Sequence, residues 1–209
     1  MIASPSMSTS STDRGAGPRP VPGAAKREAV IDCGWGRLIF GQTFDDPERL
    51  AAEIQREGEG RRDVAFNVQD PHVVLAQAPQ ALFLDPSHTF RLDLTAFNPP
   101  DNSPNGVIVR EARASDEEQI NAIYSARNMV PVESGFVARC EAEDLPVTVL
   151  VAVDAASGHV LGVVMGIDHA AAIGDPERGS SLWALAVDTQ ARPPWAIGAS
   201  QAYRIQSSQ

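Results

Sequence analysis

The stretch that most constrains the fold is a pair of apolar runs in the second half of the chain. VTVLVAV (147–153) and HVLGVVMGID (159–168) stand on either side of the short segment DAASG. Runs rich in valine predict strands, and a short connection containing glycine predicts an antiparallel hairpin between them. The polar segment DHAAAIGDPERGS (168–180) is expected to be a long loop. The second half is therefore expected to contain an antiparallel sheet.

Other elements of the second half follow from their patterns. A strand is expected at 107–110, a second helix around 136–144 and a last strand at 181–187. The spacing of Ser115 and Glu118 predicts a capping box at the start of a first helix, in which each side chain satisfies a free backbone N–H. The residues expected to face inward on the two helices are Ile120, Ile123, Tyr124, Phe136, Val137 and Cys140. The order of elements is β-α-α-β-β-β.

The first half predicts a small α+β unit. Leu38 to Phe40 and residues 64–68 are strand-like, and two further strands are expected at 81–85 and 89–94, joined by a turn at Pro86 and Ser87. A short helix is expected to start with Asp46 as its cap and Pro47 at its first position, to bury Leu50, Ala51 and Ile54, and to end at Gly58. A second Asp-Pro pair, at 70–71, predicts another short helix.

Composition shifts divide the chain. Residues 1–28, rich in Ser, Pro, Gly and Ala, are expected to be a disordered tail, and translation could start at Met1 or Met7. Residues 29–95 form the small α+β unit. The Pro- and Asn-rich stretch 96–106 reads as a linker, and a second domain follows over 107–192. The fold class predicted is α+β, with a mixed, mostly antiparallel sheet flanked by helices.

The charge excludes two classes of partner. The chain has 17 Lys and Arg against 27 Asp and Glu, for a formal net charge of −10. Nucleic acid and anionic membranes are bound through clustered cations, so neither is expected as a partner. No apolar run approaches the ~20 residues of a membrane span, and the N-terminus lacks the apolar core of a secretory signal. The sequence predicts a cytoplasmic protein with a small-molecule or protein partner.

Cysteine and histidine spacing gives no metal site. Cys33 and Cys140 lie far apart, and neither belongs to a CxxC pair. No ligand spacing links the histidines, which are His72, His88, His159 and His169. We therefore expect reduced thiols and no bound metal.

The second half resembles the beginning of the GCN5-related N-acetyltransferase family. The residues that carry the resemblance are IVREARASDEEQINAIYSARN, VLVAVDAASGHVLGVVMGI and SLWALAVDTQAR, which occur in the family's order and spacing over 107–192. With the segments IDCGWGRLIFGQTFDDPERLAAEI and FNVQDPHVVLAQAPQALFLDPSHTFRLDL, the chain is also similar to the N-terminal part of the N-acetylglutaminylglutamine synthetase family over about residues 30–192. That family joins an acetyltransferase module to an ATP-grasp ligase module, which this sequence lacks, and makes an osmoprotectant.

The resemblance implies acetyl-CoA as a substrate, bound at the last strand. In the family, the arm of the coenzyme pairs with main-chain groups of that strand, here Leu185, Ala186 and Val187, as an added strand would. An arginine, here Arg192, opens the loop that holds the diphosphate. Such a loop needs converging N–H groups, which glycines at a helix N-terminus supply.

The sequence departs from the family pattern after Arg192, where it reads RPPWAIGASQAYRIQSSQ. Trp195 stands where the first loop glycine is expected, Gly198 comes one position late, and two prolines remove N–H donors. Residues 193–209 therefore read as an aberrant tail. A frameshift or broken gene in the source sequence accounts for it, and a natural variant with a rebuilt loop is the alternative. As it stands, the chain is expected to be inactive or nearly so.

The resemblance leaves few catalytic candidates. Glu133, near the two helices where this family binds its acceptor, could deprotonate an amine through water. His169, which follows Asp168 at the end of a strand, could act as a base. A solvated loop residue is the alternative interpretation of each. Tyr203 could act as an acid toward the leaving thiolate, but it lies in the aberrant tail.

Four further residues have plainer interpretations. Trp183 is expected in the core rather than at a substrate, and Cys140 is expected to be a buried helix residue. Glu111 and Arg113 could face a substrate amine, but are more simply solvated loop charges.

Two functions stay open. The first is the N-acetyltransferase portion of an enzyme that transfers an acetyl group from acetyl-CoA to the amine of glutamine or a glutaminyl dipeptide. The second is a non-catalytic docking module, in which the apolar strand 181–187 is an open edge that invites self-association. Ligase activity is not expected, because no glycine-rich ATP-binding segment is present.

Overall fold

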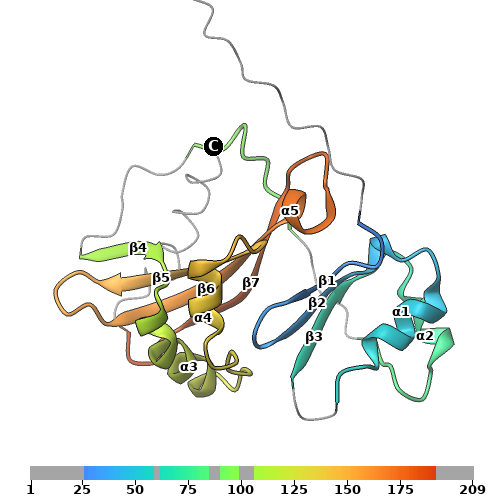
Figure 1. Cartoon of the computed structure of the whole chain (residues 1–209), viewed down its shortest axis with the longest axis horizontal. Coiled ribbons are helices and arrows are strands. Elements are labelled where there is room, and N and C mark those ends of the chain that lie inside the picture. The colour runs from blue at the N-terminus through green and yellow to red at the C-terminus, as the bar shows by residue number, and fades with distance from the viewer. Residues whose placement is uncertain (1–25, 59–61, 85–89, 99–105, 192–209) are drawn as a thin grey trace, which may run out of the picture.

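The computed structural model describes residues 26–58, 62–84, 90–98 and 106–191. They form a three-stranded sheet in the order β1-β2-β3 and a four-stranded sheet in the order β4-β5-β6-β7 (Figure 1). The strands are β1 (Val30–Asp32), β2 (Gly36–Phe40), β3 (Asp63–Asn67), β4 (Val107–Glu111), β5 (Val147–Asp154), β6 (Val160–Asp168) and β7 (Ser180–Val187). The helices are α1 (Pro47–Ile54), α2 (Pro71–Gln77), α3 (Glu117–Ala126), α4 (Phe136–Ala142) and α5 (His169–Ile173).

The four-stranded sheet confirms the expectation for the second half. Each neighbouring pair of its strands is antiparallel, and the hairpin of β5 and β6 pairs Val151 with Val163. In the smaller sheet β1 and β2 are antiparallel, whereas β2 and β3 are parallel. The α+β class, with mostly antiparallel sheets flanked by helices, is therefore as predicted.

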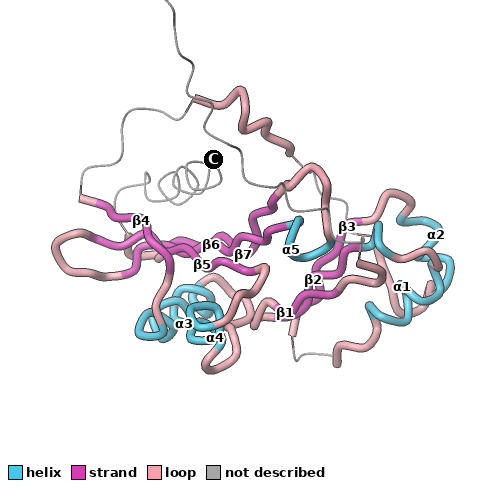
Figure 2. The backbone as a smooth tube through the Cα atoms, turned by 45° about the horizontal axis from the view of Figure 1, so that its top comes forward, coloured by secondary structure: helices cyan, strands magenta, loops and turns pink. Residues whose placement is uncertain are grey.

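Helices α3 and α4 cover one face of the larger sheet (Figure 2). The predicted helix faces are buried, since Ile120, Ile123 and Tyr124 are at most 5% exposed and Phe136 and Val137 are 1% exposed. The 3.6-residue period of α3 brings its three apolar side chains to one side, where the sheet covers them. Cys140 of α4 is half-buried.

Helix α3 starts differently from the prediction. Its N-cap is Asp116, which ends a short 3₁₀ turn, and not Ser115. A carboxylate oxygen of Asp116 accepts from the backbone N–H of Arg113 at 2.8 Å, and Arg110 of β4 donates to both oxygens at 2.6 and 3.0 Å. The expected capping box of Ser115 and Glu118 is wrong, because the ion pair with Arg110 of β4 fixes a different residue at the helix start.

Part of the segment 168–180, which was expected to be a loop, is a helix. After β6 the chain forms α5, and Asp168 caps this helix by accepting from the N–H groups of Ala170 and Ala171 at 2.8 and 3.2 Å. Gly174 ends it in the left-handed conformation. An aspartate before three alanines and a glycine after them supply both caps, which outweighed the polar character of the segment.

The two helices predicted beside the smaller sheet are present as α1 and α2, but α1 ends earlier than predicted. Asp46 caps α1 by accepting from Glu48 N at 2.9 Å, and Pro47 is its first residue, as expected. The helix ends at Ile54 and not at Gly58. Gly58 does not adopt a positive φ, so it supplies no left-handed cap.

The two strands expected at 81–85 and 89–94 are not found in the described parts of these segments. Residues 82–84 and 90–94 contain no strand. Phe83 is 86% and Phe90 is 92% exposed. Strand-like composition was therefore misleading here, because a strand also needs a neighbouring strand with which it pairs in register. The turn expected at Pro86 and Ser87 lies outside the described residues.

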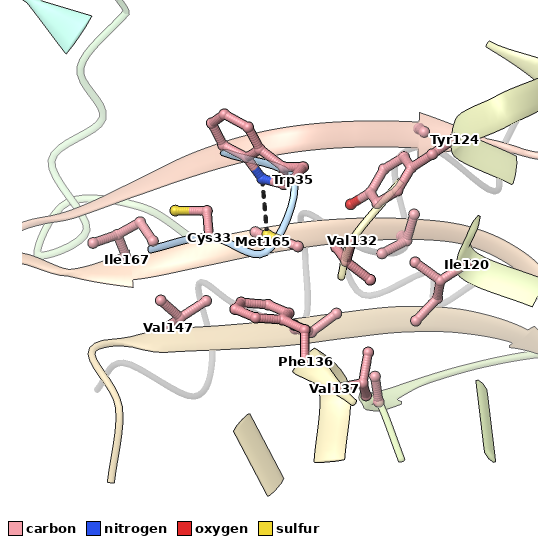
Figure 3. Packing of buried hydrophobic residues seen from close by; sticks show 14 of the residues in the cluster. Cys33, Trp35, Ile120, Tyr124, Val132, Phe136, Val137, Val147, Met165 and Ile167 are labelled. Atoms are coloured by element: carbon pink, nitrogen blue, oxygen red, sulfur yellow. Dashed lines mark hydrogen bonds between the residues drawn. The ribbon is translucent and has the colours of Figure 1, made fainter. Parts of the chain in front are cut away.

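The tip of the hairpin formed by β1 and β2 joins the two sheets (Figure 3). Trp35 is 7% exposed, and its indole Nε1 points at Met165 Sδ of β6, 3.2 Å away. Gly34 has φ +72°, and a Cβ there would lie 2.5 Å from Cγ of Phe136. Only glycine suits both the conformation and the contact. One hydrophobic core therefore draws residues from both predicted domains.

Most of the predicted tail and linker lies outside the described residues. Residues 1–25 and 99–105 are not described, so the disorder and linker predictions over 1–28 and 96–106 stay predictions. No helix among the described residues is long and apolar enough to cross a membrane.

Candidate functional site

Strand β7 is irregular at its centre. Its register against β6 shifts between the pairs Met165–Trp183 and Val163–Ala186, so that β7 carries one extra residue. Ala184, within the shift, has φ +49°. A non-glycine residue in the left-handed region costs roughly 1–2 kcal/mol. Such a β-bulge bends a strand away from its neighbour and recurs beside functional sites.

Two side chains at the C-terminal end of α3 bind main-chain carbonyls in the bulge and just after it. The hydroxyl of Tyr124 donates to the carbonyl of Ala184 at 3.1 Å, and Nε of Arg127 donates to the carbonyl of Val187 at 2.8 Å. Tyr124 is 0% exposed. Burial raises the pKa of its phenol well above the usual range, so it is a neutral donor. Hydrogen bonds from the C-terminal end of α3 therefore hold the bulged part of β7.

The main-chain groups of the residues predicted to bind the coenzyme arm point to different sides of β7. Asp188 N donates to Leu161 O at 2.9 Å, which fixes the alternation of the ladder near the end of β7. Since paired and unpaired positions alternate in an antiparallel ladder, the main-chain groups of Ala186 face β6 and those of Val187 face away from it. Leu185 lies in the bulge and is 37% exposed. Arg192 lies outside the described residues.

His169 lies at the opposite end of β7 from Val187. Its Nε2 is 2.8 Å from Oγ of Ser181, and Nε1 of Trp183 donates to the same oxygen at 2.7 Å. Its Nδ1 is 3.9 Å from a carboxylate oxygen of Asp175. Phe40 of β2 meets the imidazole ring edge-on, with 5.3 Å between centroids. The histidine is therefore part of a half-buried polar cluster and not a solvated loop residue.

Glu133 lies on the connection between α3 and α4. Its carboxylate accepts from Nη1 of Arg62 at 2.9 Å, and its backbone N–H donates to Gly34 O at 3.1 Å. The glutamate side chain is 51% exposed. In this structure Glu133 joins the second half of the chain to the smaller sheet.

The remaining candidates have structural surroundings. Trp183 is partly buried and packs against the main core, as expected. Glu111 and Arg113 are exposed. Burial raises the pKa of the Cys140 thiol to about 11, so it is not a reactive thiolate. Tyr203 lies outside the described residues. Among the described residues, no group of three or more His, Cys, Asp or Glu could hold a metal ion.

Two surface hollows lie away from β7. One, of about 350 Å³, is lined by three arginines, Arg37, Arg56 and Arg62, and two glutamates, Glu53 and Glu57. Each of these arginines forms an ion pair with at least one of the two glutamates. The other, of about 200 Å³, lies between β1 and α4. Neither is lined by residues of the bulge, so the edge of β7 is a separate feature.

Comparison with known proteins gives distant structural likeness. No family model and no curated protein matches the chain. A structural-genomics structure from Drosophila has TM-score 0.39 and 15% identity over 55% of this chain, which spans 33% of that protein. A GNAT family acetyltransferase from Staphylococcus aureus has TM-score 0.38 and 14% identity, covering 49% of this chain and 78% of that one. An acetyltransferase from Trypanosoma brucei has TM-score 0.35 and 16% identity, covering 48% and 72%.

Proposed function

We propose that residues 107–191 belong to an N-acyltransferase that transfers an acetyl group from acetyl-CoA to an amine. The observation that carries the proposal is the bulged strand β7, in which the main-chain groups of Val187 lie on the side away from β6. A strand edge of this kind pairs with an extended, amide-bearing ligand as it would with another strand. The pantetheine arm of coenzyme A is such a ligand. The element order of the second half and its resemblance to the GCN5-related family are consistent with this function.

The chemistry requires little of the protein beyond positioning. The amine nitrogen attacks the thioester carbonyl carbon, a C–N bond forms and the C–S bond breaks. The leaving thiolate takes up a proton, while the attacking nitrogen loses one to a base. Glu133 and His169 are the proposed bases, and their partners, Arg62 and Ser181, hold each in place.

The acceptor that we propose is the α-amine of glutamine or of a glutaminyl dipeptide. It rests on the similarity of residues 30–192 to the N-acetylglutaminylglutamine synthetase family. Incubation with acetyl-CoA and each amine, followed by mass spectrometry, tests it. Acetylation of glutamine but not of lysine supports this acceptor, whereas the reverse contradicts it and leaves the acyltransferase proposal standing.

Binding of acetyl-pantetheine and acetyl-CoA, followed by NMR, tests the donor site. Because the sequence after Arg192 lacks the expected glycine loop, both should bind with dissociation constants of roughly 0.1–1 mM. The largest shifts are expected at the amide of Val187. If neither ligand perturbs β7, the proposed function is wrong. If acetyl-CoA binds at micromolar concentration and acetyl-pantetheine does not, the segment after Arg192 supports the diphosphate after all.

Docking to a second copy through 181–187 is a second candidate. It is favoured by Leu182 and Leu185, which are 43% and 37% exposed on this strand. Sedimentation of the chain and of the Leu182→Lys variant separates the two functions. A dimer that Leu182→Lys dissociates supports docking, and a monomer at all concentrations contradicts it.

A further inference from the structure

Strand β7 receives side-chain hydrogen bonds from Tyr124 of α3 and from Arg127, the residue that caps the C-terminus of this helix. Tyr124 binds the carbonyl of Ala184, and Arg127 binds that of Val187. The C-terminal end of α3 therefore reaches two successive places on the strand. The carbonyl of Ala184 lies in the bulge, and that of Val187 lies on the side of β7 away from β6.

The two bonds change the chemistry of the strand edge. An open edge normally offers alternating N–H donors and C=O acceptors. Here the carbonyls at Ala184 and Val187 already accept a side-chain hydrogen bond, whereas the N–H of Val187 still points away from β6. Such an edge prefers a ligand that presents carbonyl oxygens.

The bond from Tyr124 also offsets a conformational cost. Ala184 has φ +49°, a region that alanine disfavours. The phenol is buried, and a buried carbonyl without a partner is costly. The hydroxyl therefore favours the bulged form of β7 over a regular strand.

We propose that Tyr124 and Arg127 are positioning residues that keep β7 bulged and turn its edge into a hydrogen-bond donor for the carbonyl groups of an acyl-pantetheine arm. The inference rests on the proposed acyl-CoA function. It adds which residues shape the donor site.

The Tyr124→Phe variant tests the first residue, because it keeps the ring and removes only the hydroxyl. Its affinity for acetyl-pantetheine, measured by NMR titration, should fall about tenfold. Without any ligand, the backbone chemical shifts of Ala184 should move toward those of a regular strand.

A second substitution separates positioning from general destabilisation. Glycine adopts positive φ without strain, so Ala184→Gly added to Tyr124→Phe should restore most of the lost affinity. Ala65→Gly is the matched control, because Ala65 lies in the regular ladder between β2 and β3, and it should restore none. A merely structural role for Tyr124 does not give this pattern.

Arg127→Gln should weaken acetyl-pantetheine binding about threefold, because the carbonyl of Val187 is then free to turn toward the ligand. Arg56→Gln is the control for loss of an exposed guanidinium distant from β7, and should leave binding unchanged. Equal weakening by both variants overturns the role of Arg127.

The outcomes distinguish the inference from the function beneath it. If the wild-type chain binds acetyl-pantetheine and Tyr124→Phe binds it equally well, the inference is overturned and the proposed function stands. Failure of the glycine rescue also overturns the inference. If the wild-type chain binds no acetyl-pantetheine, the function fails and the inference fails with it.

Discussion

The two sheets differ in how their faces are covered. The larger sheet packs the inward side chains of β5 and β6, such as Val151 and Met165, against α3, α4 and the tip of the β1–β2 hairpin. The smaller sheet has two helices of its own, but they form only a minor core, which consists of Ile39, Leu50, Ala51 and Val74. The larger sheet is therefore the main source of buried apolar area.

Strand β2 connects the two cores. Successive side chains of a strand point to opposite faces, so Leu38 and Phe40 enter the main core while Ile39 enters the minor one. Cys33 and Trp35, at the hairpin tip, also belong to the main core. The smaller sheet is therefore stabilised on both of its faces, and its own helices supply the smaller share of its buried apolar contacts.

The largest effect is expected from Trp35→Ala, which removes the side chain that joins the two sheets. Deleting a buried indole costs about 4 kcal/mol of unfolding free energy. Urea denaturation followed by circular dichroism measures it. Trp183→Ala, which removes a partly buried indole from β7, should cost about half as much. An equal or smaller loss at Trp35 means that the sheets are not joined there.

A smaller effect is expected from Leu50→Ala in the minor core. Leu50 is 2% exposed, so the substitution should cost about 3 kcal/mol. If the larger sheet is the main core, hydrogen exchange should speed up in β1–β3, α1 and α2 while the amides of β5 and β6 stay protected. Val73→Ala on the exposed side of α2 is the control. Equal loss of protection in β5 and β6 contradicts the comparison.

The elements of the larger sheet were readable from sequence because each has a local signal. Apolar runs located β5, β6 and β7, and the spacing of Ile120, Ile123 and Tyr124 gave the buried face of α3. Local signals also misled. Residues 81–85 and 89–94 have the composition of strands, but Phe83 and Phe90 lie in none of the described strands. A pattern of this kind needs a partner strand, which sequence does not supply.

The candidate site was only partly predictable. Resemblance directed attention to residues 185–187, but no local signal marks the bulge, because β7 has alanine where glycine is the usual residue at positive φ. Tyr124 was expected only as a core residue. Its hydroxyl matters because α3 crosses β7 sixty residues later in the chain. Contacts of this kind are decided by the fold and not by spacing.

Asp116→Asn should cost less than the core variants and should depend on pH. The hydrogen bond from Arg110, followed by that from the Arg113 backbone, holds the pKa of Asp116 below its usual range, against the effect of burial. Removing the charge should lower the unfolding free energy by about 2 kcal/mol at pH 7. A depressed pKa contributes stability above the unfolded pKa of about 4, and that contribution is lost as the pH falls through the folded pKa.

The wild-type advantage over Asp116→Asn should therefore shrink below about pH 4. Urea denaturation of both proteins at several pH values measures it. Asp45→Asn, at a side chain that is 86% exposed, is the matched control and should have little effect. An advantage that is the same at pH 3 and pH 7 means that the ionised carboxylate is not what stabilises the start of α3.

The smallest effect is expected at the polar contact between the two sheets. Nη1 of Arg62 donates to Glu133 at 2.9 Å and to Asp32 at 3.2 Å. Nε and Nη2 of the same side chain donate to Glu57, and this hydrogen bonding is the largest cause of the lowered pKa of the Glu57 carboxylate. The guanidinium side chain is 24% exposed, so water and salt screen it. Arg62→Gln should lower the unfolding free energy by about 0.5–1 kcal/mol in low salt and by almost nothing in 1 M salt.

Arg27→Gln is the control for this last prediction, because Arg27 is 86% exposed and lies 3.9 Å from Asp45. It should change stability in neither salt condition. A loss at Arg62 that approaches the loss at Trp35, or that persists in 1 M salt, would make charge the main force between the sheets. A small, salt-sensitive loss leaves the burial of the Trp35 side chain in the main core as the main force, since apolar burial is not weakened by screening.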